Sequence, residues 1–365
     1  MRKARWLAEW RKSVGKPVLY HVISRVVDRR FVLGTEEKEK FRTLMRMQEN
    51  FTGCRVLSYC LMDNHFHLLL EVPPMVEGGI QDEVLLKRLG ALYGGDFVGG
   101  VAQELANARK AVYARETGMD EAVAAIHQRF TYRMQDLGEF MKGLLQRFTQ
   151  WFNRAHSRTG RLWEDRFKSV IVEDGIAART MSAYIDLNPA RAGMVKDPAE
   201  YRWSGYGEAV GGGRKGNGKK AREGLVRACF CDLGVGFEVE KWAEVCRLYR
   251  RLMGLGLGKK QGRAEVSPSS RGLGQTARNT AELLESEDNE TVLKDLGMAK
   301  MLRCRIRYFT DGAVIGSREF VNEAFASARE RFGPRRKDGA RKLRGGSAAA
   351  SGTLWSLRDL RKGFA

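Results

Sequence analysis

The sequence of 365 residues lacks the features that mark several classes of protein. Its six cysteines include no pair at CxxC spacing, so a zinc ribbon is not indicated. No apolar stretch approaches the length of a membrane span, and the opening MRKARWLAEWRKSVG has no apolar core of signal-peptide length. We therefore expect a soluble cytoplasmic protein whose cysteines stay reduced and which has no membrane partner.

Acidic residues are scarce relative to basic ones. Lys and Arg number 64 against 44 Asp and Glu, which gives a formal net charge of +20. Such a surplus attracts polyanions, and nucleic acid is the first candidate because each neutralised phosphate releases a counterion. A surface that is basic only for solubility would give the same composition, so charge alone does not decide the function.

Apolar periodicity predicts an α+β fold. Strands are expected at 17–30, 54–62 and 65–72 and at the end of 161–174, and helices at 35–51, 132–153 and 175–189. The residues Asp63 and Asn64 between the second and third strands predict a hairpin. The order β-α-β-β-α-β-α indicates a ferredoxin-like antiparallel sheet with helices packed on it.

Composition divides the chain into five parts. We expect a main domain over 1–210 with an insertion around 75–130, a basic loop and helical extension over 211–253, a linker over 254–279, a small basic module over 280–346, and a tail over 347–365. In the basic loop, 211–222, contact with phosphate and simple solvation are equally compatible with the sequence. The C-terminal module is expected to hold a hairpin around Asp311 and Gly312 and a helix capped by Ser317.

Histidine is scarce, yet two of the five histidines stand one residue apart in CLMDNHFHLLLEV. Side chains alternate across a strand, so His65 and His67 share one face while Phe66 lies on the other. Two imidazoles side by side make half of a metal site, since neutral histidine is a common ligand. Two half-buried histidines with hydrogen-bond partners would give the same pattern.

A second motif, AYIDLNPARAGMV, strengthens the metal interpretation. Tyr184 and Asn188 are four residues apart, and such a pair shares one face of a helix. The Asn188 Oδ1 atom could complete a metal site begun by His65 and His67, with Tyr184 beside the metal as a nucleophile. Taken singly, Tyr184 could be a core aromatic residue and Asn188 a helix terminator before Pro189.

Four stretches together resemble a known family. YHVISRVVDRRFVL, LSYCLMDNHFHLLLEV, GRLWEDRFKSVIVED and YIDLNPARAGMVKDPAEYRWSGY look like the REP-associated tyrosine transposases of the HUH superfamily. The resemblance covers roughly 15–210, apart from the insertion. It implies that His65 and His67 are the paired metal ligands, Tyr184 the catalytic tyrosine, and Asn188 the third ligand.

The resemblance implies a metal-dependent single-strand DNA endonuclease and strand transferase. Such an enzyme would cleave and rejoin hairpin (REP-like) DNA through a 5′-phosphotyrosine link, with Mg²⁺ or Mn²⁺ as cofactor. A homodimer and a nucleoid-associated place in the cytoplasm are expected with it. The alternatives are a DNA- or RNA-binding regulator without catalysis on the same fold, and a hydrolytic nuclease without a covalent intermediate.

Basic residues near these motifs are candidates for holding the DNA backbone. Each could equally be ordinary surface charge. The candidates are Arg161, Arg166, Lys168, Arg191, Arg214, Lys215, Lys219 and Lys220.

Overall fold

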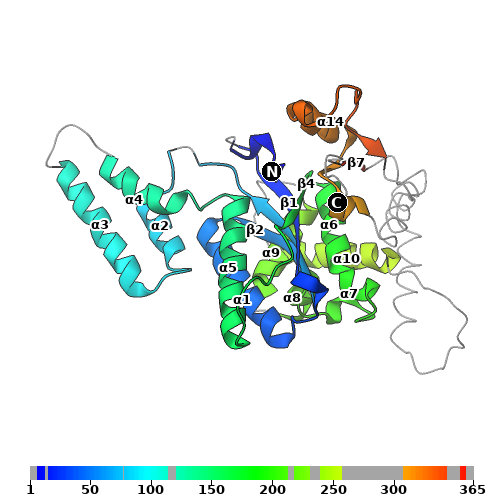
Figure 1. Ribbon diagram of the computed structural model, residues 1–365, viewed down its shortest axis with the longest axis horizontal. Coiled ribbons are helices and arrows are strands. Elements are labelled where there is room, and N and C mark those ends of the chain that lie inside the picture. The colour runs from blue at the N-terminus through cyan, green and yellow to red at the C-terminus, as the bar shows by residue number, and fades with distance from the viewer. Residues whose placement is uncertain are drawn as a thin grey trace, which may run out of the picture. The chain divides into compact units, whose positions relative to one another are not determined.

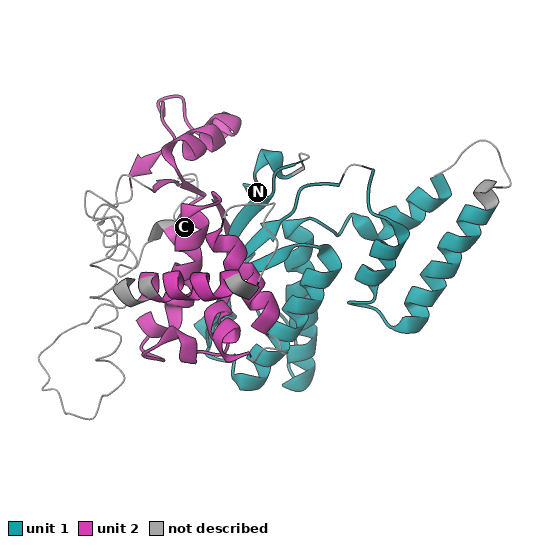
Figure 2. Ribbon diagram, turned by 180° about the vertical axis from the view of Figure 1, so that it is seen from behind, with its two compact units in different colours: residues 1–56, 61–167 teal, residues 57–60, 168–365 magenta. Residues whose placement is uncertain are grey.

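The fold is taken from a computed structural model of the chain. It describes residues 6–12, 15–76, 78–113, 121–212, 218–230, 239–256, 307–342 and 354–358. The chain divides into two compact units, residues 1–56 with 61–167 and residues 57–60 with 168–365 (Figure 2). The predicted linker, 254–279, lies outside the described residues from 257 onward.

The first unit carries the predicted β-α-β-β arrangement, followed by the insertion and a long helix (Figure 1). Its strands lie in the order β2-β3-β1, and β1 pairs antiparallel with β3. The elements are η1 (Glu9–Lys12), β1 (Val18–Arg25), η2 (Val27–Arg29), α1 (Thr35–Thr52), β2 (Arg55–Leu61), β3 (His65–Val72), α2 (Asp82–Leu89), α3 (Gly95–Tyr113), α4 (Glu121–Thr131) and α5 (Leu137–Ala155).

The second unit is a smaller mixed sheet with helices. Its strands lie in the order β4-β5-β7-β6, with β4 and β5 parallel and β5 and β7 antiparallel. Together the units confirm the predicted α+β class. The elements are β4 (Lys168–Val172), α6 (Ile176–Asp186), α7 (Asn188–Arg191), η3 (Pro198–Glu200), α8 (Gly205–Gly211), α9 (Gly218–Cys229), α10 (Val239–Gly256), α13 (Arg307–Asp311), β5 (Val314–Gly316), α14 (Arg318–Ser327), η4 (Arg329–Arg331), β6 (Arg341–Lys342) and β7 (Trp355–Leu357).

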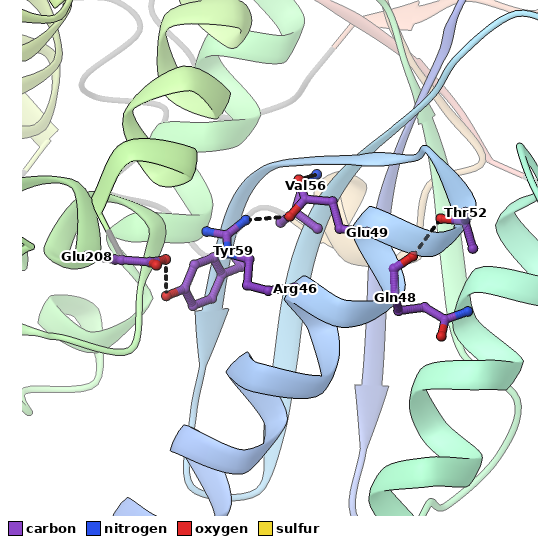
Figure 3. A network of polar contacts seen from close by, with 7 residues as sticks. All are labelled: Arg46, Gln48, Glu49, Thr52, Val56, Tyr59 and Glu208. Atoms are coloured by element: carbon purple, nitrogen blue, oxygen red, sulfur yellow. Dashed lines mark hydrogen bonds and ion pairs between the residues drawn. The ribbon is translucent and has the colours of Figure 1, made fainter. Parts of the chain in front are cut away.

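Helix α1, Thr35–Thr52, forms over the stretch 35–51 that was predicted to be helical. Glu36 and Glu37 in the first turn face the positive end of the helix dipole. Gly53 ends the helix in the left-handed conformation, at φ 75°, and its N–H bonds back to the Glu49 carbonyl. Figure 3 shows the Glu49 carboxylate also accepting hydrogen bonds from Arg46 and from the Val56 backbone N–H, at 2.8 and 2.9 Å. One carboxylate therefore ties the end of α1 to the start of β2.

An aromatic cluster holds α1 and α5 against strand β3. The ring of Phe41 lies 4.7 Å from that of Phe66 and 5.1 Å from that of Phe148. Trp163 packs edge-on against Phe66 at 5.4 Å and donates its Nε1–H to Thr149 Oγ1 at 3.1 Å. Because Phe66 faces this cluster, its neighbours His65 and His67 face the opposite side of the strand.

The insertion predicted around 75–130 is a helical group, α2 to α4, with a core of its own. The buried apolar side chains of these helices pack together with Phe51 of α1 and with Met134, which lies between α4 and α5. The members from the helices themselves are Leu85, Leu89, Val101, Leu105, Val123 and Phe130. Figure 1 shows these three helices side by side.

The basic loop predicted over 211–222 is wrong in its second half. Helix α9 already begins at Gly218, so the last five residues of the predicted loop are helical. The Arg222 guanidinium donates to the carbonyls of Ala209 and Gly212, at 3.0 and 2.8 Å, and so satisfies the end of α8. Burial of the apolar face of α9 outweighs the turn-forming tendency of the local glycines.

The hairpin expected around Asp311 and Gly312 is also wrong. Residues Arg307–Asp311 form the short helix α13, and β5 pairs with β4 and β7 instead. Strand β7 lies in the stretch 347–365 that was predicted to be a tail. It is the antiparallel partner of β5, in place of the neighbouring strand that the hairpin prediction required. The Ser317 cap is confirmed, since its Oγ accepts from the Phe320 N–H at 3.1 Å.

A buried carboxylate organises the second unit around helix α6. Asp186 is fully buried and accepts hydrogen bonds from Ser58 Oγ at 3.0 Å, from the Tyr249 hydroxyl at 2.7 Å and from the Tyr206 N–H at 2.9 Å. Burial raises the pKa of Asp186 to about 6, although these donors oppose the shift. Helix α6, which carries Tyr184, is thus anchored by one residue to three separate segments.

The raised pKa of Asp186 gives stability a definite pH dependence. Its folded pKa lies above the unfolded value near 3.9, so the stabilisation is complete below about pH 4 and is lost as pH rises through about 6. This term amounts to about 3 kcal/mol of unfolding free energy. Asp186→Asn should remove this pH-dependent contribution. Denaturant titrations between about pH 4 and about pH 7 should then show an unfolding free energy that varies less with pH than that of the wild type.

The matched control is Asp96→Asn, a change at an exposed carboxylate in the first turn of α3. The unfolding free energy of Asp96→Asn should vary with pH between about pH 4 and about pH 7 in parallel with that of the wild type. A profile for Asp186→Asn that also stays parallel would contradict the assignment.

Candidate active site

The predicted histidine pair lies together on strand β3. The ring centroids of His65 and His67 are 5.2 Å apart, with the rings nearly perpendicular. His67 is 3% exposed, whereas His65, at the start of the strand, is half-buried. The pair therefore opens toward one end of β3, where His65 remains accessible.

Asn64 determines which nitrogen of His65 carries the proton. Its Nδ2 donates to the Arg29 carbonyl at 2.9 Å, so its Oδ1 is the atom facing His65 Nδ1, at 2.7 Å. An amide oxygen only accepts hydrogen bonds, so His65 Nδ1 must be the donor. In the neutral ring the lone pair then lies on Nε2, the nitrogen that could ligate a metal.

A third histidine, His21 on strand β1, completes the arrangement and was missed by the sequence interpretation. Its Nε2 lies 2.9 Å from His67 Nδ1, and the two rings stack with centroids 5.2 Å apart. His21 is fully buried. In the pairing of β1 with β3, His21 is directly opposite Leu69, and His67 is directly opposite Ile23. The contact between His21 and His67 is therefore a diagonal one between neighbouring strands.

The second predicted pair lies on the α6–α7 segment of the other unit. Tyr184 is 3% exposed, and its ring packs edge-on against Phe309 at 4.7 Å. The Arg191 guanidinium lies 4.2 Å from the Tyr184 ring centroid and donates to the Tyr184 carbonyl at 2.6 Å. Asn188 begins α7, and its Nδ2 donates to the Tyr184 carbonyl at 3.3 Å.

Arg191 also holds the amide oxygen of Asn188. Its guanidinium donates to Asn188 Oδ1 at 2.9 Å, which orients that oxygen away from the helix backbone. An amide oxygen has two lone pairs, so it can accept this bond and still face a cation. Arg191, predicted as a DNA contact, is thus a structural partner of both Tyr184 and Asn188.

Three other predicted DNA contacts lie on the surface. Arg161 and Arg166 are exposed in the connection between α5 and β4. Lys168, exposed at the start of β4, lies with its Nζ 3.3 Å from Asp311 Oδ1. Exposed ion pairs of this kind are weak, so the contact with Asp311 holds the Lys168 side chain only loosely.

The predicted contacts of the 211–222 stretch are only partly described. Lys219 is exposed on α9, with its Nζ 3.9 Å from Glu223 Oε1, and Lys220 is half-buried on the same helix. Arg214 and Lys215 lie outside the described residues.

The described residues contain no group of three or more His, Cys, Asp and Glu side chains suited to a metal ion. Of the three histidines, His65 and His67 are the predicted ligands, whereas His21 contacts His67 through its Nε2. Two neutral nitrogen donors with open positions fit a divalent ion that also binds phosphate oxygen.

Comparison with known proteins supports the family resemblance. Residues 16–78, which contain β1, His21 and the histidine pair, match the family described as Transposase IS200 like. The predicted family resemblance is confirmed over this segment. Comparison with curated proteins finds no match.

A solved structure is also similar to this chain. It is described as "Structure of the REP associates tyrosine transposase bound to a REP hairpin", with 14% sequence identity and a TM-score of 0.34. The match covers 58% of this chain and 86% of that one.

In the part of the chain that the structure describes, no helix is long and apolar enough to cross a membrane.

The role of Asn64 can be tested on the metal-free protein. Asn64→Ala removes the acceptor at His65 Nδ1 and should shift the neutral ring toward the Nε2–H tautomer. Asn64→Asp keeps an acceptor and should retain the Nδ1–H form. Ring-nitrogen NMR shifts, recorded above the ordinary histidine pKa near 6.5, distinguish the tautomers; an unchanged spectrum in Asn64→Ala would refute the assignment.

Proposed function

We propose that the protein is a metal-dependent tyrosine transposase that cleaves and rejoins single-stranded DNA at hairpin elements. The IS200-like transposase match over residues 16–78 supports it, because that segment holds both candidate ligand histidines. The observation that carries the proposal is the Asn64 contact at 2.7 Å, which sets the lone pair of His65 on Nε2.

Tyr184 is the proposed nucleophile. Its phenol oxygen attacks the scissile phosphorus in line, and the bond from phosphorus to the 3′ oxygen breaks. The phenol proton passes to solvent, and the departing oxygen becomes a 3′-hydroxyl. The resulting 5′-phosphotyrosyl link retains the phosphodiester energy, so a second 3′-hydroxyl can reverse the step and join strands.

His65, His67 and Asn188 are the residues proposed to hold Mg²⁺ or Mn²⁺. When bound, such an ion would polarise a non-bridging phosphate oxygen and offset the charge that develops during transfer. His67 can ligate only if its Nδ1–H donates to His21 Nε2, leaving the lone pair on its own Nε2. His21 is therefore a positioning residue for His67.

Arg191 is proposed to position the nucleophile. Its guanidinium lies 4.2 Å from the centroid of the Tyr184 ring, and it bonds to the Tyr184 carbonyl and to Asn188 Oδ1. These contacts restrict the rotamer of both side chains, which lowers the entropy lost when the reacting groups align.

Covalent capture tests the proposal. A hairpin DNA with a labelled single-stranded flank, incubated with Mn²⁺, should yield a protein–DNA adduct that survives denaturing electrophoresis. Tyr184→Phe and His65→Ala should abolish the adduct, whereas Tyr132→Phe, a change at an exposed tyrosine, should not.

Other outcomes select the alternatives. Cleavage that persists in Tyr184→Phe would indicate a hydrolytic nuclease. Metal-independent DNA binding by the wild type with neither adduct nor cleavage would indicate a regulator that retains the fold.

The role of His21 is tested by metal affinity. His21→Phe keeps the stacked ring but cannot accept from His67, so Mn²⁺ affinity should fall roughly 10- to 100-fold. His21→Gln restores an acceptor and should recover part of it. Titration of Mn²⁺ alone, followed by its electron paramagnetic resonance signal, measures this; His156→Phe is the control, and equal loss there would exclude a specific role.

A further inference from the structure

We propose that the loop Asp28–Phe31 binds an unpaired base of the DNA on the Phe31 ring. The backbone phosphates beside that base would contact Arg29 and Arg30. This inference rests on the proposed function for its class of ligand, single-stranded DNA. It adds a contact surface outside the candidate active site.

Phe31 is the most exposed large hydrophobic residue in the described part of the chain, at 79%. Arg29 and Arg30 immediately before it are exposed as well. A solvent-facing aromatic ring beside cations is the combination that single-strand binding surfaces use, because every base has a face that can stack. Asp28 is the acidic residue within the loop, so its net charge remains positive.

Hydrogen bonds hold the loop against the hairpin turn next to the histidines. The Val26 N–H donates to the Asn64 carbonyl, and the Leu33 N–H donates to the Asp63 carbonyl, both at 2.9 Å. The Asn64 side chain donates to the Arg29 carbonyl at 2.9 Å. Both ends of the loop and its middle are therefore tied down, which lowers the ordering cost of binding.

The backbone at the middle of the loop adopts an uncommon conformation. Asp28 and Arg29 have φ values of 56° and 55°, in the left-handed region that residues other than glycine rarely adopt. Such conformations persist where the surroundings impose them, and they cluster at binding sites. Here the Arg29 carbonyl accepts a hydrogen bond from the Asn64 side chain, which is one of the contacts that hold this conformation.

Asn64 links the loop to the candidate active site. One end of its amide holds the Arg29 carbonyl, and the other accepts from His65 Nδ1. The loop that carries Phe31 and the first of the two histidines are therefore joined through one side chain.

Binding without cleavage tests the inference. In EDTA, fluorescence anisotropy should show that Phe31→Ala binds a hairpin with a single-stranded flank roughly tenfold more weakly than the wild type. Phe31→Trp should bind at least as well as the wild type. Tyr132→Ala, at another exposed aromatic residue, should change nothing.

Two comparisons separate stacking from charge. Phe31→Ala should not alter binding to a blunt duplex, and its salt dependence on the flanked hairpin should keep the wild-type slope. Arg30→Ala should reduce that slope by about one unit, for one phosphate contact. Equal loss on both DNAs, or no loss on either, overturns the inference.

The experiment also distinguishes this inference from the proposed function. If the Tyr184-dependent adduct forms but Phe31→Ala binds normally, only the stacking surface is wrong. If no adduct forms while the Phe31 effect persists, the loop is a single-strand site on a protein that does not cleave. A change in oligomeric state of Phe31→Ala with unchanged DNA binding would assign the surface to self-association and overturn the inference.

Discussion

The alternation of side chains along strand β3 is the constraint on which the candidate site depends. Phe66 packs into the aromatic cluster with Phe41 and Trp163, and this burial holds the strand against α1 and α5. His65 and His67 are consequently held on the other face of the strand. The cluster therefore stabilises the fold and orients the two imidazoles at once.

Asn64 extends that rigidity from the strand to its surroundings. Its side chain joins the Arg29 carbonyl to His65 Nδ1, and its backbone carbonyl receives the Val26 N–H. The identity of this residue therefore affects three things together: the hairpin turn, the conformation of the Asp28–Phe31 loop and the tautomer of His65. His21 acts on His67 in a comparable way, from the neighbouring strand.

The second unit uses a buried carboxylate where the first uses aromatic packing. Asp186 holds α6 by accepting bonds from Ser58, Tyr206 and Tyr249, and Tyr184 stands two residues earlier on the same helix. Arg191 then restrains Tyr184 and Asn188 from the following turn. The proposed nucleophile and its neighbours are thus positioned by polar contacts that a hydrophobic pattern does not reveal.

Local patterns determined a large part of this description. The periodicity of 35–51, the Asp63–Asn64 turn and the HFH alternation predicted α1, the hairpin and the shared face of two histidines, because each depends on residues close in sequence. Contacts between distant residues were decided only by the tertiary structure. They include the partner of His67 on β1, the donors around Asp186, and the pairing of β5 with β4 and β7. Strand register and burial set these contacts, and neither is encoded in any one segment of the chain.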